Sequence, residues 1–573
     1  MLNRYIEIKA RLGLIILSYF FASQRIANST WQQFERDTAR WLMCRGFSDV
    51  RLIGGSGDKG ADILGVLKGE QWVIQCKHYQ KSRLSKKVVQ EVFNAAQYYK
   101  ADKIAISTSQ YPSPQLREEI ERYEQTYYPL KINLFIPKNL TNDNKLSDYP
   151  KSRKQLRRYQ GKVVDNFSDA LIQVGQGQVV MATGLGKTVV MAETVASLID
   201  SREIKNILVL AHTTPIVNQL HQSFWHQLPK WVPTQQFGDG EKPNSFEGIT
   251  FALIQSVVNR LETFPPFDLI LVDEAHHIGS RSYLRTIKRL NPPMLGGVTA
   301  TPWRGDGFDL DELLGEPVAQ IGIEEGLSNG FLAEVDYRLL ADNINWEFVR
   351  RRSVNNYSIE SLNKKLFLPK RDEKCVQMIL EIFKNDKRQS GIIFCQTIGH
   401  AEEFAKYLRH YQMRAEVIHH DLKPREREAI MSKFKAGKLD FVVTVDLFNE
   451  GVDVPDVDML VFLRVTHSRR IFVQQLGRGL RWSDEKDKVI VLDFVSDLRR
   501  MAQVIQLDNQ VRGIGTERVG LGNALVSFDD RSAGSYLKEW MLDQADLFNR
   551  INDPSLDQIS FDFPEPPDPG NVQ

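Results

Sequence analysis

Three things are scarce in this 573-residue sequence: cysteine, long apolar runs and net charge. The four cysteines stand far apart and none belongs to a CxxC pair, which argues against a structural zinc site and makes a disulfide framework unnecessary. The apolar segment 12–22 is shorter than the roughly 20 residues that cross a bilayer. Because the formal charge is only +2, any binding to a polyanion must come from local basic patches.

The apolar segment 12–22 follows Arg4, Lys9 and Arg11, an arrangement that a signal peptide shares. No small-x-small cleavage site follows it cleanly. The favoured interpretation of residues 1–30 is therefore a buried or partner-packed helix, or an over-extended start of the chain. A signal peptide or anchor is the alternative, and we expect no membrane association.

The length of the chain predicts about three domains. A polar, turn-rich stretch at 138–155 is typical of a linker and follows an N-terminal domain at 31–137. From 156 onward, apolar strand-like runs alternate with amphipathic stretches, which predicts parallel sheets with crossover helices. We divide this part into domains at 156–335 and 373–515, a connecting insertion at 336–372, and an extension at 516–573 with an acidic end that we expect to be disordered.

The segment VVMATGLGKTVVMAET, residues 179–194, has the pattern of a strand, a glycine-rich turn and a helix. In such a turn the backbone N–H groups and the helix N-terminus bind phosphate, since no Cβ blocks the approach. Lys187 would reach the β- and γ-phosphates of ATP and the Thr188 hydroxyl would bind Mg²⁺, although Met181 stands where the general pattern has its first glycine. The predicted nucleotide-binding residues here are Ala182, Thr183, Gly184, Leu185, Gly186, Lys187 and Thr188.

A second apolar strand, LILVDEAHH at 269–277, ends in two acids. Asp273 is placed to hold Mg²⁺, directly or through water, and Glu274 to orient and deprotonate the attacking water. The expected cofactors are therefore ATP and Mg²⁺. Their use favours a cytoplasmic location.

Together these motifs resemble those of superfamily 2 helicases of the DEAH-box type, and the later motifs match in order. The resemblance implies that Gln160, in LRRYQ, contacts the adenine base. It implies that TATPWR, residues 299–304, couples the state of ATP to the grip on nucleic acid. It also assigns Gly451 and Asp453, in NEGVDVP, to the nucleotide site.

The segment QQLGRGLR, residues 474–481, resembles the second lobe's contribution to the same site. The transition state of γ-phosphoryl transfer spreads negative charge over oxygens, so a cation must approach it across a cleft. Arg478 and Arg481 are three residues apart and can lie on one helix face, where both would act as arginine fingers. Hydrolysis would then require closure of the two lobes.

The hairpin ADILGVLKGEQWVIQCKHY, residues 61–79, carries an acid on one arm and an amide and a lysine on the other. Residues two apart in a strand share a face, so Gln75 and Lys77 point the same way. Across a Lys68-Gly69-Glu70 turn, Asp62 can approach both near the open end of the hairpin. An acid and an amide oxygen can hold Mg²⁺, and the lysine can orient a metal-activated water, which is the chemistry of phosphodiester hydrolysis.

This hairpin, with the helix and GGSGDKG turn before it, resembles the catalytic core of the Mrr-type restriction endonucleases, within the PD-(D/E)xK nuclease fold. The resemblance implies that Asp62 is the metal-binding acid, that Gln75 replaces the usual second acid, and that Lys77 is the catalytic lysine. Glu35 resembles an accessory acid that approaches from the opposite side, with Asp58 as a further member. Because Gln75 is neutral, the site would bind metal with one fewer charge.

Two basic stretches fit DNA as the partner: KHYQKSRLSKKVVQEV at 77–92 and KSRKQLRR at 151–158. The predicted architecture is α/β, with an N-terminal restriction-endonuclease-like domain followed by two tandem RecA-like parallel-sheet domains. The predicted function is an ATP-dependent DNA helicase or translocase with a metal-dependent DNA endonuclease domain, used to restrict foreign DNA. The alternatives are a repair or recombination helicase whose N-terminal domain trims or holds DNA, and a non-cleaving clamp with a nucleotide switch.

Overall fold

The computed structural model of the chain describes residues 30–53, 60–78, 87–109, 114–126, 131–135, 149–201, 204–238, 240–300, 308–340, 356–358, 372–445, 457–463, 488–494, 519–521 and 560–562. Several predicted features lie outside these residues: the apolar segment 12–22, Asp58, residues 79–86 of the first basic stretch, residues 301–304 of TATPWR, Gly451, Asp453, Arg478 and Arg481. Within the described part of the chain, no helix has the length and apolar character needed to cross a membrane.

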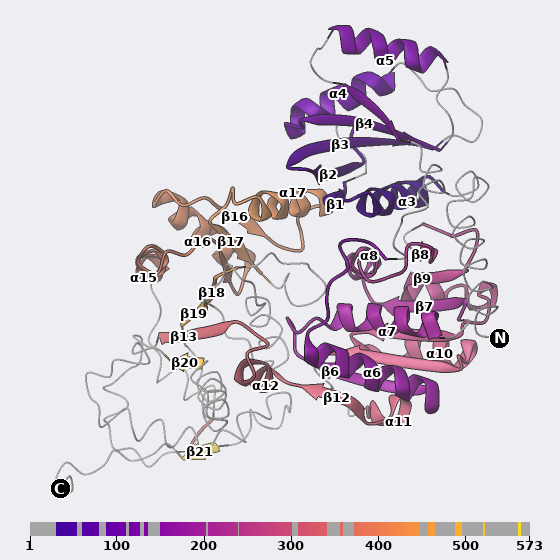
Figure 1. Ribbon diagram of the computed structural model, residues 1–573. Helices are drawn as coiled ribbons and strands as arrows, with labels where there is room; N and C mark the ends of the chain where they lie inside the picture. The colour runs from indigo at the N-terminus through magenta and orange to yellow at the C-terminus, as the bar shows by residue number, and fades with distance from the viewer. Residues whose placement is uncertain are drawn as a thin grey trace, which may run out of the picture. The chain divides into compact units, whose positions relative to one another are not determined.

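The N-terminal domain is a five-stranded sheet with helices on both faces (Figure 1). The strand order is β1-β2-β3-β4-β5, in which β1, β2 and β3 pair antiparallel and β3, β4 and β5 pair parallel. Its elements are α3 (Trp31–Cys44), β1 (Ser48–Leu52), β2 (Ile63–Leu67), β3 (Glu70–Lys77), α4 (Lys87–Tyr99), β4 (Lys103–Thr108), α5 (Pro114–Thr126) and β5 (Ile132–Phe135).

The alternation predicted along β3 is confirmed. Trp72, Ile74 and Cys76 join the apolar cluster formed with α3, whereas Val73 joins the cluster formed with α4 on the other face of the sheet. Helix α3 begins where the Thr30 side chain accepts a hydrogen bond from the Gln33 N–H, a side-chain cap of an otherwise unpaired backbone donor.

Lobe 1, residues 149–321, contains a seven-stranded sheet of order β12-β6-β11-β10-β7-β9-β8. The pairs among β7, β8, β9, β10 and β11 are parallel, as the alternation of strands and helices predicted. Its elements are α6 (Arg158–Gln173), β6 (Gln176–Met181), α7 (Lys187–Ser201), β7 (Asn206–Ala211), α8 (Thr214–Phe224), β8 (Thr234–Phe237), β9 (Gly248–Leu253), α9 (Ile254–Val258), η2 (Leu261–Thr263), β10 (Leu269–Asp273), η3 (Ala275–His277), α10 (Arg281–Leu290), β11 (Met294–Thr299), α11 (Asp311–Leu314) and β12 (Pro317–Ile321).

Lobe 2, from residue 323 onward, is built on a second seven-stranded sheet of order β16-β17-β15-β18-β19-β13-β20. Its elements are α12 (Ile323–Ser328), β13 (Glu334–Leu340), α15 (Asp372–Asn385), β15 (Gly391–Phe394), α16 (Ile398–His410), β16 (Ala415–Ile418), α17 (Pro424–Lys435), β17 (Phe441–Thr444), β18 (Met459–Phe462), β19 (Lys488–Phe494) and β20 (Val519–Leu521). The predicted α/β architecture of three sheets is thereby confirmed.

The structure corrects two details of the predicted division. Residues 336–340, expected in a connecting insertion, belong to β13, which pairs with β19 in parallel over seven positions and buries Val335 and Tyr337. Residues 560–562, expected to be disordered, form β21 and pair antiparallel with β14 (Asn356–Ser358), with Tyr357 opposite Phe561. Aromatic residues favour strands, and Phe561 is such a residue within an acidic part of the chain.

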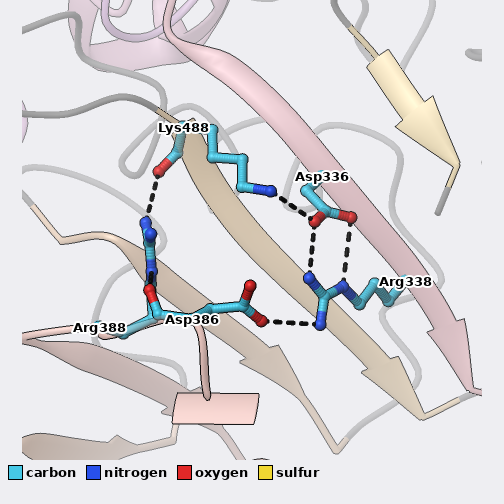
Figure 2. A network of polar contacts seen from close by, with 5 residues as sticks. All are labelled: Asp336, Arg338, Asp386, Arg388 and Lys488. Carbon is cyan, nitrogen blue, oxygen red and sulfur yellow. Dashed lines mark hydrogen bonds and ion pairs between the residues drawn. The ribbon is translucent and has the colours of Figure 1, made fainter. Parts of the chain in front are cut away.

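A network of ion pairs joins β13 to the rest of lobe 2 (Figure 2). The Arg338 guanidinium contacts the carboxylates of Asp336 and Asp386, and Lys488 Nζ lies 3.1 Å from Asp336 Oδ2. Arg388 donates a hydrogen bond to the Lys488 carbonyl oxygen at 3.1 Å. Burial opposes ionisation of Asp336, but Arg338 and Lys488 outweigh it and lower the pKa of this carboxyl group. The network holds β13, the first strand after lobe 1, in the sheet of lobe 2.

Candidate active sites

The hairpin of β2 and β3 closes through a two-residue turn. Leu67 is opposite Glu70, and the residues between them, Lys68 and Gly69, have positive φ angles of 53° and 81°. Two successive left-handed residues match the twist of a tight hairpin, and glycine adopts this conformation without strain. The turn is therefore shorter than the predicted Lys68-Gly69-Glu70, and Glu70 belongs to the strand.

Asp62 and Gln75 meet at the open end of this hairpin. Gln75 Nε2 donates a hydrogen bond to Asp62 Oδ2 at 2.5 Å, and the Cys76 N–H donates to the same oxygen at 2.6 Å. Both side chains are buried, and Gln75 Oε1 has no hydrogen-bond partner among the described residues. A buried acceptor without a donor, next to a carboxylate, suits a hard divalent cation. The residues present therefore fit the implied Mg²⁺.

Lys77 lies on the same face of β3 as Gln75 and faces α4. Its Nζ is 3.5 Å from Glu91 Oε2, with the two side chains 26% and 34% exposed. Gly60, with a φ of +89°, lies against α4, since a Cβ there would lie 2.5 Å from the Glu91 carbonyl oxygen. The sequence prediction did not include Glu91, although this residue lies in the helical stretch KKVVQEVF directly after the predicted hairpin.

Glu35 approaches the hairpin from the opposite face, on α3. Burial chiefly, and then the carboxylates of Asp62 and Glu35, raise the pKa of the Cys76 thiol. Cys76 follows Gln75 directly in β3. Both predicted acids thus act electrostatically on the Cys76 thiol. Among the described residues, no three His, Cys, Asp or Glu side chains gather in a way that could hold a metal ion.

The glycine-rich turn 182–186 connects β6 to α7, as predicted. Gly184 and Gly186 have φ angles of +93° and +90°, so both positions need the freedom of glycine. Lys187 is the first residue of α7, and its Nζ lies 3.4 Å from the Met181 carbonyl oxygen. Thr188 follows in the first turn of the same helix. A glycine-rich turn at a helix N-terminus is the geometry that the sequence predicted, and binding of phosphate there stays a prediction.

Asp273 and Glu274 stand at the carboxyl end of β10. Asp273 is buried as the last residue of the strand, and Glu274 adopts a left-handed conformation with φ 50° and ψ 55°. A left-handed non-glycine residue is strained, and such strain concentrates at functional sites. The His276 ring nitrogen Nδ1 is 3.3 Å from Glu274 Oε2. Burial and the neighbouring Asp273 and Glu274 raise the pKa of Tyr283, so this side chain stays neutral.

Gln160 is buried near the start of α6. Its Oε1 accepts a hydrogen bond from the Arg157 N–H at 3.0 Å, which ties the side chain to the beginning of the helix. This contact gives the residue a structural role beside its predicted contact with adenine.

Three family models match the chain in succession. Residues 26–139 match a restriction endonuclease family, residues 153–304 the res subunit of type III restriction enzymes, and residues 372–483 the helicase conserved C-terminal domain. The chain thus carries an Mrr-type restriction endonuclease domain followed by the two domains of a superfamily 2 helicase.

This nuclease–helicase fusion has relatives among both helicases and restriction enzymes. It is 24% identical over 355 residues to the putative ATP-dependent helicase IRC3 of Saccharomyces cerevisiae, covering 59% of this chain and 51% of IRC3. It is 25% identical over 398 residues to the endonuclease subunit of the type I restriction enzyme EcoKI of Escherichia coli, covering 58% and 34%. The chain thus spans about half the length of IRC3 and about a third of the EcoKI subunit.

A solved structure shows the same fold as the nuclease–helicase fusion. It is the ATP-dependent type ISP restriction-modification enzyme LlaBIII bound to DNA, with a TM-score of 0.50 and 17% identity. The match covers 91% of this chain and 42% of LlaBIII.

Proposed function

We propose that this nuclease–helicase fusion uses ATP hydrolysis to move along DNA and cuts DNA with its N-terminal domain in a Mg²⁺-dependent reaction. The observation that carries the proposal is the buried pair Asp62–Gln75, whose unpartnered amide oxygen stands beside a carboxylate. Lys77 lies two residues along the same strand face. A hairpin that only supported the fold would have no use for these three side chains on one face.

For the nuclease reaction, Asp62 and the Gln75 oxygen are the proposed metal ligands. A bound Mg²⁺ would supply Lewis acidity and a water of lowered pKa. The Lys77 ammonium would offset the charge that develops on the phosphate, and Glu91 would hold that ammonium in place. Glu35 would complete the site from α3.

For ATP hydrolysis, the turn residues Ala182, Thr183, Gly184, Leu185 and Gly186 would bind the phosphates with Lys187, as in DEAH-box proteins. Thr188 and Asp273 are the proposed ligands of the nucleotide's Mg²⁺, and Glu274 is the proposed base. We assign Gln160 to the adenine, Gly451 and Asp453 to the nucleotide site, and Arg478 and Arg481 to the transition-state charge.

The proposed biological role is restriction of foreign DNA in the cytoplasm. Its support is the restriction endonuclease match at residues 26–139, together with the type I relative. DNA is the proposed partner for the same reason.

The test is to incubate the purified protein with plasmid, linear duplex and single-stranded DNA, each with and without ATP and Mg²⁺. We expect Mg²⁺-dependent cutting by the parent and its loss in Lys77→Ala and Asp62→Ala, with DNA-stimulated ATP hydrolysis retained. Lys187→Ala should lose ATP hydrolysis because the γ-phosphate loses its cation. Cutting by Lys77→Ala at the parent rate would show that this site performs no catalysis.

A further inference from the structure

Helix α3 contacts lobe 1 through a row of buried polar side chains. Gln33 Nε2 donates a hydrogen bond to the Thr234 carbonyl oxygen at 2.9 Å. One turn further along α3, the Arg36 guanidinium binds both carboxylate oxygens of Glu241, with the Nη1–Oε1 bond at 2.8 Å. In both contacts the hydrogen-bond donors belong to the N-terminal domain and the acceptors to lobe 1.

Arg40, a further turn along α3, is almost completely buried, with 2% of its surface exposed. Its guanidinium donates to the carbonyl oxygens of Val232 at 2.6 Å and Pro229 at 3.0 Å, both in lobe 1. A buried cation is costly unless its donors are satisfied, and these carbonyl oxygens of lobe 1 satisfy the Arg40 guanidinium. Trp225 of lobe 1 also belongs to the apolar cluster of Phe34 and Trp41, which extends the contact into the domain's core.

The same helix carries the accessory acid of the nuclease site. Glu35 precedes Arg36 in sequence, and its carboxylate acts on Cys76 in β3. Thr38 Oγ1 lies 3.3 Å from Ser107 Oγ of β4, on the sheet side of the helix. Helix α3 therefore lies between the nuclease sheet and lobe 1, and a shift of the helix changes both contacts.

On the lobe 1 side, Glu241 belongs to a tight turn. Gly238 and Glu241 exchange backbone hydrogen bonds of 2.9 and 3.2 Å. A Cβ on Gly238 would lie 3.0 Å from Leu253 Cβ and 3.2 Å from Ser256 Oγ, so the turn packs where β9 ends and α9 begins. In the parallel pairs of this sheet, that is the edge at which Asp273 ends β10. Ligands of open α/β sheets bind at the carboxyl ends of the strands.

We propose that the Arg36–Glu241 pair couples the two activities: it holds α3, and with it Glu35, in the position needed for DNA cleavage, so that cutting depends on docking of the nuclease domain onto lobe 1. The inference rests on the proposed nuclease function and adds Arg36 and Glu241 as positioning residues. A structural change at the carboxyl edge of the lobe 1 sheet would move the turn of Glu241. This turn would pass the movement to α3 and so to the nuclease site.

A charge exchange in the full-length protein tests this coupling. Arg36→Glu and Glu241→Arg should each reduce the rate of DNA cleavage by about tenfold or more, while ATP hydrolysis changes by less than about twofold, since directly paired charges couple strongly. The double variant restores a pair of opposite charges and should recover most of the cleavage. Arg51→Glu is the matched control, because Arg51 is partly exposed on β1 and pairs with Asp49 two residues away.

Amide hydrogen exchange of residues 31–44 gives a readout that does not depend on cleavage. Exchange should be faster in each single variant and return toward the parent rate in the double variant. Glu241→Gln keeps the volume of the side chain and serves where a charge reversal does not fold; it should show a smaller loss of cleavage in the same direction.

Single variants that cut at the parent rate, or a double variant that cuts no better than either single one, would overturn the coupling. A parent protein that never cuts DNA would instead overturn the proposed nuclease function. In that case, the exchange measurement alone decides whether the pair docks the domain.

Discussion

Gln75 is a neutral side chain in the position where the resemblance to PD-(D/E)xK nucleases predicts an acid, and its contacts show how the amide packs. Its Nε2 donates to Asp62 at 2.5 Å while both residues are buried. Two carboxylates at this distance would repel each other unless a cation lay between them. The amide therefore keeps the pair together without metal, and its oxygen is the proposed metal ligand.

Replacing Gln75 by glutamate should make the stability of the N-terminal domain depend on metal. In EDTA the melting temperature of Gln75→Glu should fall by several degrees, because exchanging a buried hydrogen bond for a like-charge contact costs about 1–3 kcal/mol. Mg²⁺ should reverse most of the fall, and cleavage should persist with an altered metal preference. Gln97→Glu makes the same change at an exposed position of α4 and should show no such dependence. Equal melting curves for Gln75→Glu in EDTA and Mg²⁺ would remove Gln75 from the ligand set.

Glu274 combines a strained backbone with a contact to His276. Because Glu274→Gln keeps the shape and removes the base, the variant should bind ATP, hydrolyse it at least about a hundredfold more slowly, and hold DNA more tightly in ATP than the parent does. Filter binding of labelled ATP and DNA, beside phosphate release, measures the three effects. Rapid phosphate release would assign the base elsewhere.

In lobe 1, β11 is tightly enclosed at its two glycines. A Cβ on Gly296 would lie 2.5 Å from Leu271 Cδ2 and 2.8 Å from Phe167 Cζ. A Cβ on Gly297 would collide with Leu314 and lie 2.8 Å from the Cβ of Ala275, the residue directly after Glu274. The strand thus controls where the acidic turn after β10 lies.

Gly297→Ala should therefore damage ATP hydrolysis without touching a catalytic group. Overpacking of this kind costs about 1–3 kcal/mol, and relief by movement of Ala275 would displace Glu274. We expect a lower melting temperature and an ATPase rate reduced by roughly tenfold. Gly161→Ala, on α6 with open space around its Cβ position, is the control and should be neutral or slightly stabilising. A rate of ATP hydrolysis in Gly297→Ala equal to the parent's would show that the turn after β10 tolerates the shift.

The elements themselves could be predicted because their signals are local. Residues two apart along β3 share a face, as predicted, so that Val73 and Cys76 lie in clusters on opposite faces, and the glycine-rich turn gave the start of α7. Glu91 was missed because it approaches Lys77 from a helix 14 residues further along the chain, and no local pattern fixes that distance. The docking face of α3 was missed because burial of Arg36 depends on the Glu241 carboxylate and burial of Arg40 on carbonyl groups of lobe 1, which the periodicity of α3 does not report.

At the scale of the whole molecule, charged residues of the N-terminal domain affect the pKa of a histidine in lobe 1. His221 on α8 is completely buried, stacked on Phe251, and its pKa is lowered well below 6.5 by burial and by Arg36 and Arg40 of α3. The folded protein therefore holds this imidazole neutral, whereas the unfolded chain protonates it near pH 6.5. Stability from this residue is present above that pH and is lost as the pH falls below it.

His221→Gln should consequently flatten the dependence of stability on pH. Between pH 7 and 5 the parent loses up to about 1.4 kcal/mol per pH unit from one such proton, and the variant should lack this part of the slope. Melting temperatures at several pH values measure it, with His410→Gln, an exposed residue of lobe 2, as the control. Parallel curves for His221→Gln and the parent would mean that His221 titrates in the folded protein as it does in the unfolded chain.

The contact of α3 with lobe 1 also bears on the DNA fragments that the enzyme would leave behind. A nuclease domain held against lobe 1, and not only joined to it by a linker, would cut at a constant distance from the point where the translocating lobes hold the DNA. The ends of the DNA fragments would then mark the positions at which translocation stopped, to within one translocation step. Lengthening the predicted linker within residues 138–148 would leave that distance unchanged, and sequencing of the fragment ends would measure it.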